Sequence, residues 1–100
     1  MPYINLLDRA EFNTAAVHRF IVEECGFPVT LTKVELAAAA GELETVRATH
    51  HNRYSRRMAL RWLESLGVAV DWDIANDEAR RELARLAQRE AEAELAELDS

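Results

Sequence analysis

The sequence predicts a mainly helical protein that carries one small β-hairpin and ends in a long helix. Ala, Leu, Glu and Arg dominate the 100 residues, with only three glycines and two prolines, which is typical of helices. Two short helical patterns flank a proline, and the residues near position 50 then become polar before another helical pattern begins. Together these features favour one small helical domain with a hairpin inserted in it.

The composition narrows the classes of protein that this chain can be. Cys25 is the single cysteine, so no internal disulfide forms and a reducing compartment fits best. No apolar run approaches the roughly 20 residues of a membrane span, and the N-terminus lacks a basic segment followed by an apolar one. We therefore expect a cytoplasmic protein that does not enter a membrane.

Motifs of catalysis and of cofactor binding are not found in the sequence. It contains no glycine-rich phosphate loop and no spacing of His, Cys, Asp or Glu that suits a metal ion. His18 lies on a helical pattern without a nucleophile or a metal ligand at a useful distance, so a structural role is favoured. We expect no enzymatic activity, no cofactor and no metal.

The charged residues are unevenly distributed, although the net charge is −6. Residues 1–45 hold three basic and seven acidic side chains, residues 46–65 hold five and one, and residues 66–100 hold four and ten. A basic stretch between acidic flanks is typical of a small contact surface for phosphate. The alternative is that these arginines pair with carboxylates of the acidic terminal helix.

Two short helices are predicted before residue 41. Residues 1–7 form an apolar arm that packs on the body. Asn13 is a suitable N-cap for a helix of about 11 residues that ends near Gly26. Pro28 breaks the pattern, and residues 32–35 (Thr-Lys-Val-Glu) match a capping box, so a second helix should begin at Lys33 and stop at Gly41. Two short helices joined by a tight turn form a candidate helix-turn-helix.

Residues 42–66 admit two interpretations. The polar run at His50–Arg53 favours a two-stranded wing with its tip at residues 50–52, after which Ser55 caps a helix that stops at Gly67. The alternative is one continuous helix, because apolar or aromatic residues recur at every fourth position, which would make an all-α bundle. In both cases the residues expected to be structural are Leu43, Val46, Tyr54, Met58, Trp62 and Leu63.

The remainder of the chain is predicted to be a linker and an acidic helix. Residues 68–72 alternate like a strand, and Asn76 is the expected N-cap of a helix that runs to about Leu98. The domains are thus residues 1–67 and residues 68–100. The thin, alanine-rich apolar stripe of this helix suits close packing on a partner helix or on the body of the protein, and in the first case a homodimer is expected to form through it.

The order of motifs resembles a known family. The chain contains GEL-x-x-VR at residues 41–47, then RY, a capping serine and an apolar helix that ends in RWL. Residues 14–66 thereby resemble the excisionase and MerR-type winged helix-turn-helix domains of phages and actinobacteria, and phage terminase small subunits look similar. The resemblance implies a small regulatory or architectural protein that binds double-stranded DNA.

The resemblance also implies which residues contact DNA. A recognition helix would bring Thr30, Thr32 and Lys33 to the major groove, although the rest of that helix, VELAAAA, has no further side-chain donor for base edges. The wing and its flanks would contact the backbone through His50, His51, Asn52, Arg53, Arg47, Arg56 and Arg57. The alternative function is a protein-interaction module without DNA binding, such as a phage-encoded inhibitor of a host protein.

Overall fold

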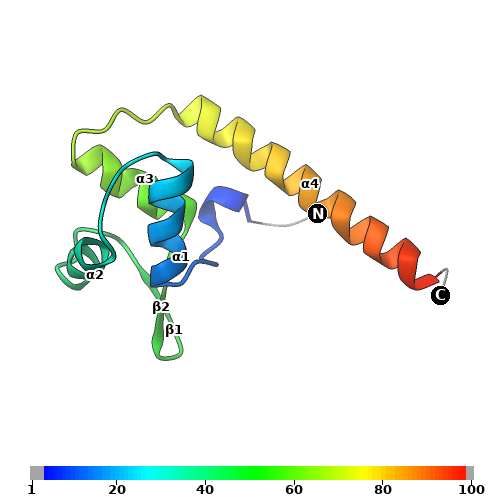
Figure 1. The fold of residues 1–100 in the computed structure, drawn as a ribbon, viewed down its shortest axis with the longest axis horizontal. Coiled ribbons are helices and arrows are strands. Elements are labelled where there is room, and N and C mark those ends of the chain that lie inside the picture. The colour runs from blue at the N-terminus through cyan, green and yellow to red at the C-terminus, as the bar shows by residue number, and fades with distance from the viewer. Residues whose placement is uncertain (1–3, 99–100) are drawn as a thin grey trace. The chain divides into compact units, whose positions relative to one another are not determined.

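The computed structural model describes residues 4–98 and divides the chain into two compact units, residues 1–70 and 71–100. In the first unit, η1 (Leu6–Asp8), α1 (Thr14–Arg19), η2 (Phe20–Glu24) and α2 (Leu31–Ala39) precede a hairpin and α3, and the second unit is one long helix, α4 (Figure 1). The predicted mainly helical fold with a small wing and a long C-terminal helix is confirmed. None of the described helices is long and apolar enough to cross a membrane.

The N-terminal arm and the first helix follow the prediction where they are described. Leu6 and Leu7 of the arm are buried, while residues 1–3 lie outside the described part of the chain. Asn13 caps α1, because its Oδ1 accepts a hydrogen bond from the Ala16 amide at 2.7 Å. The helix continues through η2, a turn of π-helix, which ends at Glu24. The chain then turns away at Gly26, whose φ of 69° is left-handed.

The second helix begins two residues earlier than predicted. Its N-cap is Thr30, whose Oγ1 accepts a hydrogen bond from the Lys33 amide at 3.1 Å. Thr32 is therefore inside the helix, and the predicted capping box at residues 32–35 is wrong. Two threonines at i and i+2 are both competent caps, and only the extended backbone of Thr30 shows which one is used. The helix stops at Gly41 as predicted, with φ of 77°.

Residues 46–53 form a two-stranded hairpin that we call the wing. Strand β1 (Val46–Ala48) pairs antiparallel with β2 (His51–Arg53), and the turn between them is Thr49–His50. The continuous helix of the alternative interpretation is therefore wrong. One physical reason lies at Tyr54, whose backbone exchanges hydrogen bonds of 2.9 and 3.0 Å with Phe12 and so cannot belong to a helix.

The core of the first unit contains most of the residues expected there. Helix α3 (Arg56–Ser65) is capped by Ser55, as predicted, through a 3.2 Å bond from the Met58 amide. Val46 and Met58 are the exceptions, since 43% of Val46 is exposed on the wing and Met58 is partly exposed. The buried apolar residues of this unit are Leu6, Leu7, Val17, Ile21, Val34, Ala37, Leu43, Tyr54, Ala59, Leu60, Trp62 and Leu63.

Helix α4 (Trp72–Leu98) begins earlier than predicted. The Asp71 carboxylate accepts hydrogen bonds from the Asp73 and Ile74 amides, both at 3.1 Å, so Asp71 caps the helix. Asn76, the predicted cap, lies inside the helix and donates to the Trp72 carbonyl at 2.8 Å. Residues 68–71 form the predicted linker and adopt no regular secondary structure.

The wing turn stores backbone strain at Thr49. This residue has φ of 62°, a left-handed conformation that costs a β-branched residue about 1–3 kcal/mol and glycine almost nothing. We expect Thr49→Gly to raise the free energy of unfolding by about 0.5–1 kcal/mol after the greater flexibility of unfolded glycine is subtracted. Thermal denaturation measures the change. Ala48→Gly in β1 is the control and should lower the free energy of unfolding. An equal decrease of this free energy in both variants would contradict strain at Thr49.

Candidate nucleic-acid interface

The strand register distributes the polar residues of the wing over its two faces. Arg47 pairs with Asn52, and Ala48 pairs with His51, so these two pairs project from opposite faces of the ribbon. Arg53 lies on the same face as His51, because side chains alternate along a strand. Each face of the wing therefore carries one arginine and one uncharged polar or histidine side chain.

The two wing arginines have no carboxylate partner among the residues that the structure describes. Within residues 4–98, neither Arg47 nor Arg53 forms an ion pair, and Arg47 is exposed while Arg53 is partly exposed. His50 and His51 are also exposed. The tip is Thr49–His50, one residue earlier than predicted, so His51 and Asn52 belong to β2. Figure 1 shows the wing projecting away from the helices of its unit.

Arg56, by contrast, forms contacts within the first unit. Its Nη1 lies 2.6 Å from Glu11 Oε1, and its guanidinium carbon lies 4.8 Å from the centre of the Phe12 ring and 5.8 Å from that of Phe20. The side chain is only 17% exposed. An arginine that is both ion-paired and stacked on aromatic rings loses these contacts if it turns toward a phosphate.

Arg57 and Arg61 are also paired within the first unit. Arg57 Nε lies 2.5 Å from Asp8 Oδ1, and Arg61 Nη1 lies 3.6 Å from Glu44 Oε1. Arg56 and Arg57 are among the residues expected to contact the DNA backbone, and the structure shows both of them partly buried and ion-paired within the first unit. The carboxylates of Asp8 and Glu11 belong to the N-terminal segment, whereas the alternative interpretation of the charge pattern took the partners from the terminal helix.

Helix α2 carries few side chains that can form hydrogen bonds with the edges of DNA bases. Thr30 caps the helix, and Thr32 and Lys33 are exposed in its first turn, as expected for residues that approach a ligand. Beyond them the exposed side chains include Glu35 and Leu36, of which Leu36 is 65% exposed, and neither offers a hydrogen-bond donor to a base edge. Figure 1 shows α2 apart from the wing tip, so the predicted residues form two separate groups.

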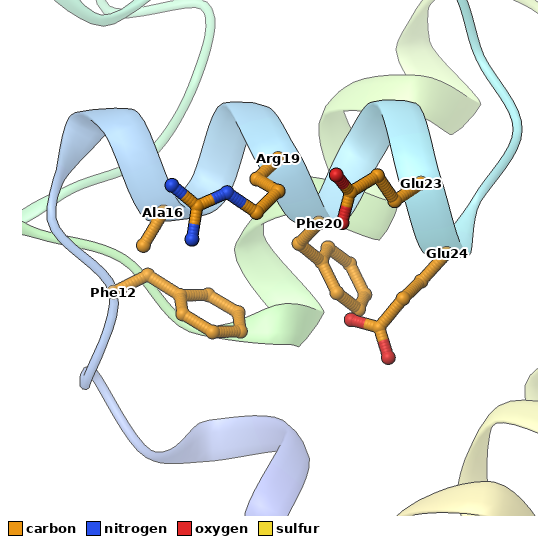
Figure 2. Close-up of a pocket in the computed structure, with 6 residues that line it drawn as sticks. All are labelled: Phe12, Ala16, Arg19, Phe20, Glu23 and Glu24. Carbon is orange, nitrogen blue, oxygen red and sulfur yellow. The ribbon is translucent and has the colours of Figure 1, made fainter.

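A shallow pocket of about 170 Å³ lies beside α1 and η2. Its lining residues are Phe12, Ala16, Arg19, Phe20, Glu23 and Glu24. Figure 2 shows the two phenyl rings side by side, with charged side chains of both signs around them. The described residues hold no group of three or more His, Cys, Asp or Glu side chains placed to bind a metal ion. The ionisable side chains of the pocket are those of Arg19, Glu23 and Glu24.

The surroundings of the Cys25 thiol lower its reactivity. Burial raises the pKa of Cys25 from its usual value near 9 to about 11, and the Glu24 carboxylate acts in the same direction. Because the thiolate is the reactive form, only about one Cys25 in a thousand is reactive at pH 8. Sequence analysis could find the cysteine but not its environment.

We expect Arg56→Ala to lower the free energy of unfolding by about 1–2 kcal/mol, because it removes a largely buried stem, a cation–π contact and an ion pair. Arg61→Ala is the control, with an exposed pair that should cost less than about 0.5 kcal/mol. Urea denaturation measures both. If both substitutions lower the free energy of unfolding by the same small amount, the side chain of Arg56 does not stabilise the fold.

We expect Cys25 to react with a thiol reagent such as Ellman's reagent about 100 times more slowly at pH 8 than a free cysteine does. The rate should rise about tenfold for each pH unit up to pH 10, because the thiolate fraction rises in this way. The same protein in denaturing urea is the control and should react at the ordinary rate. Fast labelling of the folded protein at pH 8 would contradict a raised pKa.

Comparison of the chain with models of known protein families, with curated proteins and with solved structures found no significant match to any of them. The functional assignment of the wing therefore rests on the residues of this chain. They are two arginines on a projecting hairpin that have no carboxylate partner in the described part of the chain, whereas the three arginines of α3 are paired.

Proposed function

We propose that the protein binds the phosphate backbone of double-stranded DNA through its wing, as a small regulatory or architectural protein of the excisionase or MerR kind. The observation that supports this proposal is that Arg47 and Arg53 lack carboxylate partners within residues 4–98, whereas Arg56, Arg57 and Arg61 have them. An arginine on each face of a narrow ribbon can contact phosphates on both sides of a groove into which the ribbon is inserted.

The scarcity of hydrogen-bond donors on α2 indicates that this binding depends little on base sequence. Lys33 is the one basic residue of the helix, and the side chains that follow it offer no hydrogen-bond donor for base edges. Contacts to phosphate supply affinity without sequence information. We therefore propose weak, salt-sensitive binding that two copies, joined through the C-terminal helix, would strengthen on one duplex.

A second candidate function is a protein-interaction module, such as an inhibitor of a host protein. Leu36 is 65% exposed and Leu31 is 38% exposed on α2, which is the helix that would carry polar side chains in a DNA reader. Exposed leucines on one short helix are typical of a surface that another protein covers. This candidate predicts that the wing arginines are dispensable and that Leu36 is not.

We expect wild-type protein to bind a 20 bp duplex at low salt with an affinity that falls steeply as salt rises, because counterions are released from the phosphates. The double variant Arg47→Glu and Arg53→Glu should bind at least about tenfold more weakly and should lower the salt slope by about 2. Fluorescence anisotropy over a series of salt concentrations measures both quantities.

The matched control is the double variant Arg80→Glu and Arg89→Glu in α4, which changes the net charge by the same amount at exposed positions. It should retain most of the affinity. If both double variants lose affinity equally, the effect reflects total charge and the wing is not the contact surface. No binding of wild-type protein at low salt would exclude the DNA proposal and favour the protein-interaction candidate.

A further inference from the structure

The tip of the wing carries two exposed histidines. His50 belongs to the turn, and His51 is the first residue of β2, where it pairs with Ala48. In the described part of the chain neither wing histidine forms an ion pair or a side-chain hydrogen bond. His18 differs, because its Nε2 lies 2.7 Å from the Val29 carbonyl oxygen. The two imidazole rings of the wing are thus accessible to solvent and to a ligand.

The charge of the wing depends on these two side chains. Residues 46–53 contain Arg47, Arg53 and no acidic residue, so their net charge is +2 with neutral histidines and +4 with both histidines protonated. Histidine is the side chain that ordinarily gains its charge between about pH 8 and pH 5, whereas arginine keeps its charge throughout this range. The positive charge of the wing therefore doubles as the solution becomes mildly acidic.

The charged groups around the wing histidines are basic on the wing and acidic only at its base. Arg53 lies on the same face as His51, and Arg47 lies on β1. Two carboxylates stand at the base: Glu44, two residues before β1, and Glu11, next to the backbone pair that follows β2. Both carboxylates are ion-paired with arginines of α3. The anion that meets an added proton at the tip is then a phosphate of a bound duplex.

We propose that His50 and His51 take up protons when the wing binds DNA, so that the affinity for a duplex rises as the pH falls from about 8 to 5.5. This role of the histidines rests on the proposed function, because it concerns the same surface and the same ligand. A phosphate close to an imidazole ring favours the protonated ring. Proton binding and DNA binding therefore strengthen each other, as thermodynamic linkage requires.

The number of cations at the tip determines how strongly salt weakens the binding. A neutral imidazole can donate a hydrogen bond to a phosphate, but it carries no charge that would release a counterion. Each protonated histidine in contact with a phosphate releases one, which steepens the slope of log K against log salt by about 0.9. Arg47 and Arg53 supply the contacts that remain at pH 8, so binding at that pH is weaker and less sensitive to salt.

Fluorescence anisotropy with the same duplex, over one salt series at pH 8 and one at pH 5.5, tests the proton uptake. We expect the dissociation constant of the wild-type protein to be at least about tenfold lower at pH 5.5, and its salt slope to be steeper by about 1–2. The double variant His50→Gln and His51→Gln should change its affinity less than about threefold between the two pH values. It keeps His18 and every carboxylate, so it also shows how pH acts on the rest of the chain.

Permanent charges at the same two positions should replace the protons. The double variant His50→Arg and His51→Arg should bind at pH 8 at least about tenfold more tightly than the wild-type protein, and its affinity should no longer depend on pH. The matched control is Ala84→Arg and Ala93→Arg, which adds two charges at exposed positions of α4. This control should gain less than about threefold in affinity and should keep the wild-type pH dependence. Circular dichroism shows whether each variant is folded.

The outcomes separate proton uptake at the tip from DNA binding itself. If the wild-type protein binds at pH 8 and gains nothing at pH 5.5, the proton uptake is wrong and the wing proposal stands. An equal gain in the wild-type protein and the glutamine variant also overturns it, because the protons then bind elsewhere. The same holds if the arginine variant binds no better than the wild-type protein at pH 8. No binding of wild-type protein at either pH rejects the proposed function and the proton uptake together.

Discussion

The backbone pair between Phe12 and Tyr54 is the contact on which the rest of the first unit depends. Two hydrogen bonds of 2.9 and 3.0 Å hold the N-terminal segment against the end of β2, although 42 positions separate the two residues. The pair interrupts the helical pattern that runs through Tyr54. It also brings the acidic residues of the N-terminal segment to the start of α3, where Asp8 and Glu11 meet Arg57 and Arg56.

This contact separates the two wing arginines from Arg56 and Arg57 at the start of α3. The arginines at the start of α3 complete the internal packing, because one of them covers the rings of Phe12 and Phe20, which lie 5.4 Å apart. The wing arginines lie beyond the contact and remain available to a ligand. The wing carries two arginines and no acidic residue, whereas the whole chain has a net charge of −6.

The sequence predicted the helices and strands better than it predicted which distant residues contact each other. Local signals placed Asn13 and Ser55 as caps and Gly41 as a helix stop, because a cap depends on residues within one turn. The cap positions of α2 and α4 were wrong, since neighbouring Thr, Asp and Asn residues compete for the same role.

Contacts between distant parts of the chain had no local signal. The partners of Arg56 and Arg57 are 45 and 49 residues away, so no periodicity could indicate that these side chains are paired. The choice between wing and continuous helix was open for the same reason. The spacing of four residues between apolar positions fits a continuous helix as well as a wing. Only the backbone pairing of Tyr54 with Phe12, which the sequence does not indicate, decides between them.

The most direct test of the wing as the phosphate contact is a titration of isotope-labelled protein with a short duplex, followed by amide and arginine side-chain NMR signals. Our account predicts that signals of residues 46–53 shift progressively, whereas the Nε signals of Arg56 and Arg57 and the amides of α4 stay in place. Shifts concentrated on α2 or α4, or displacement of the Arg56 signal with an unchanged wing, would contradict it.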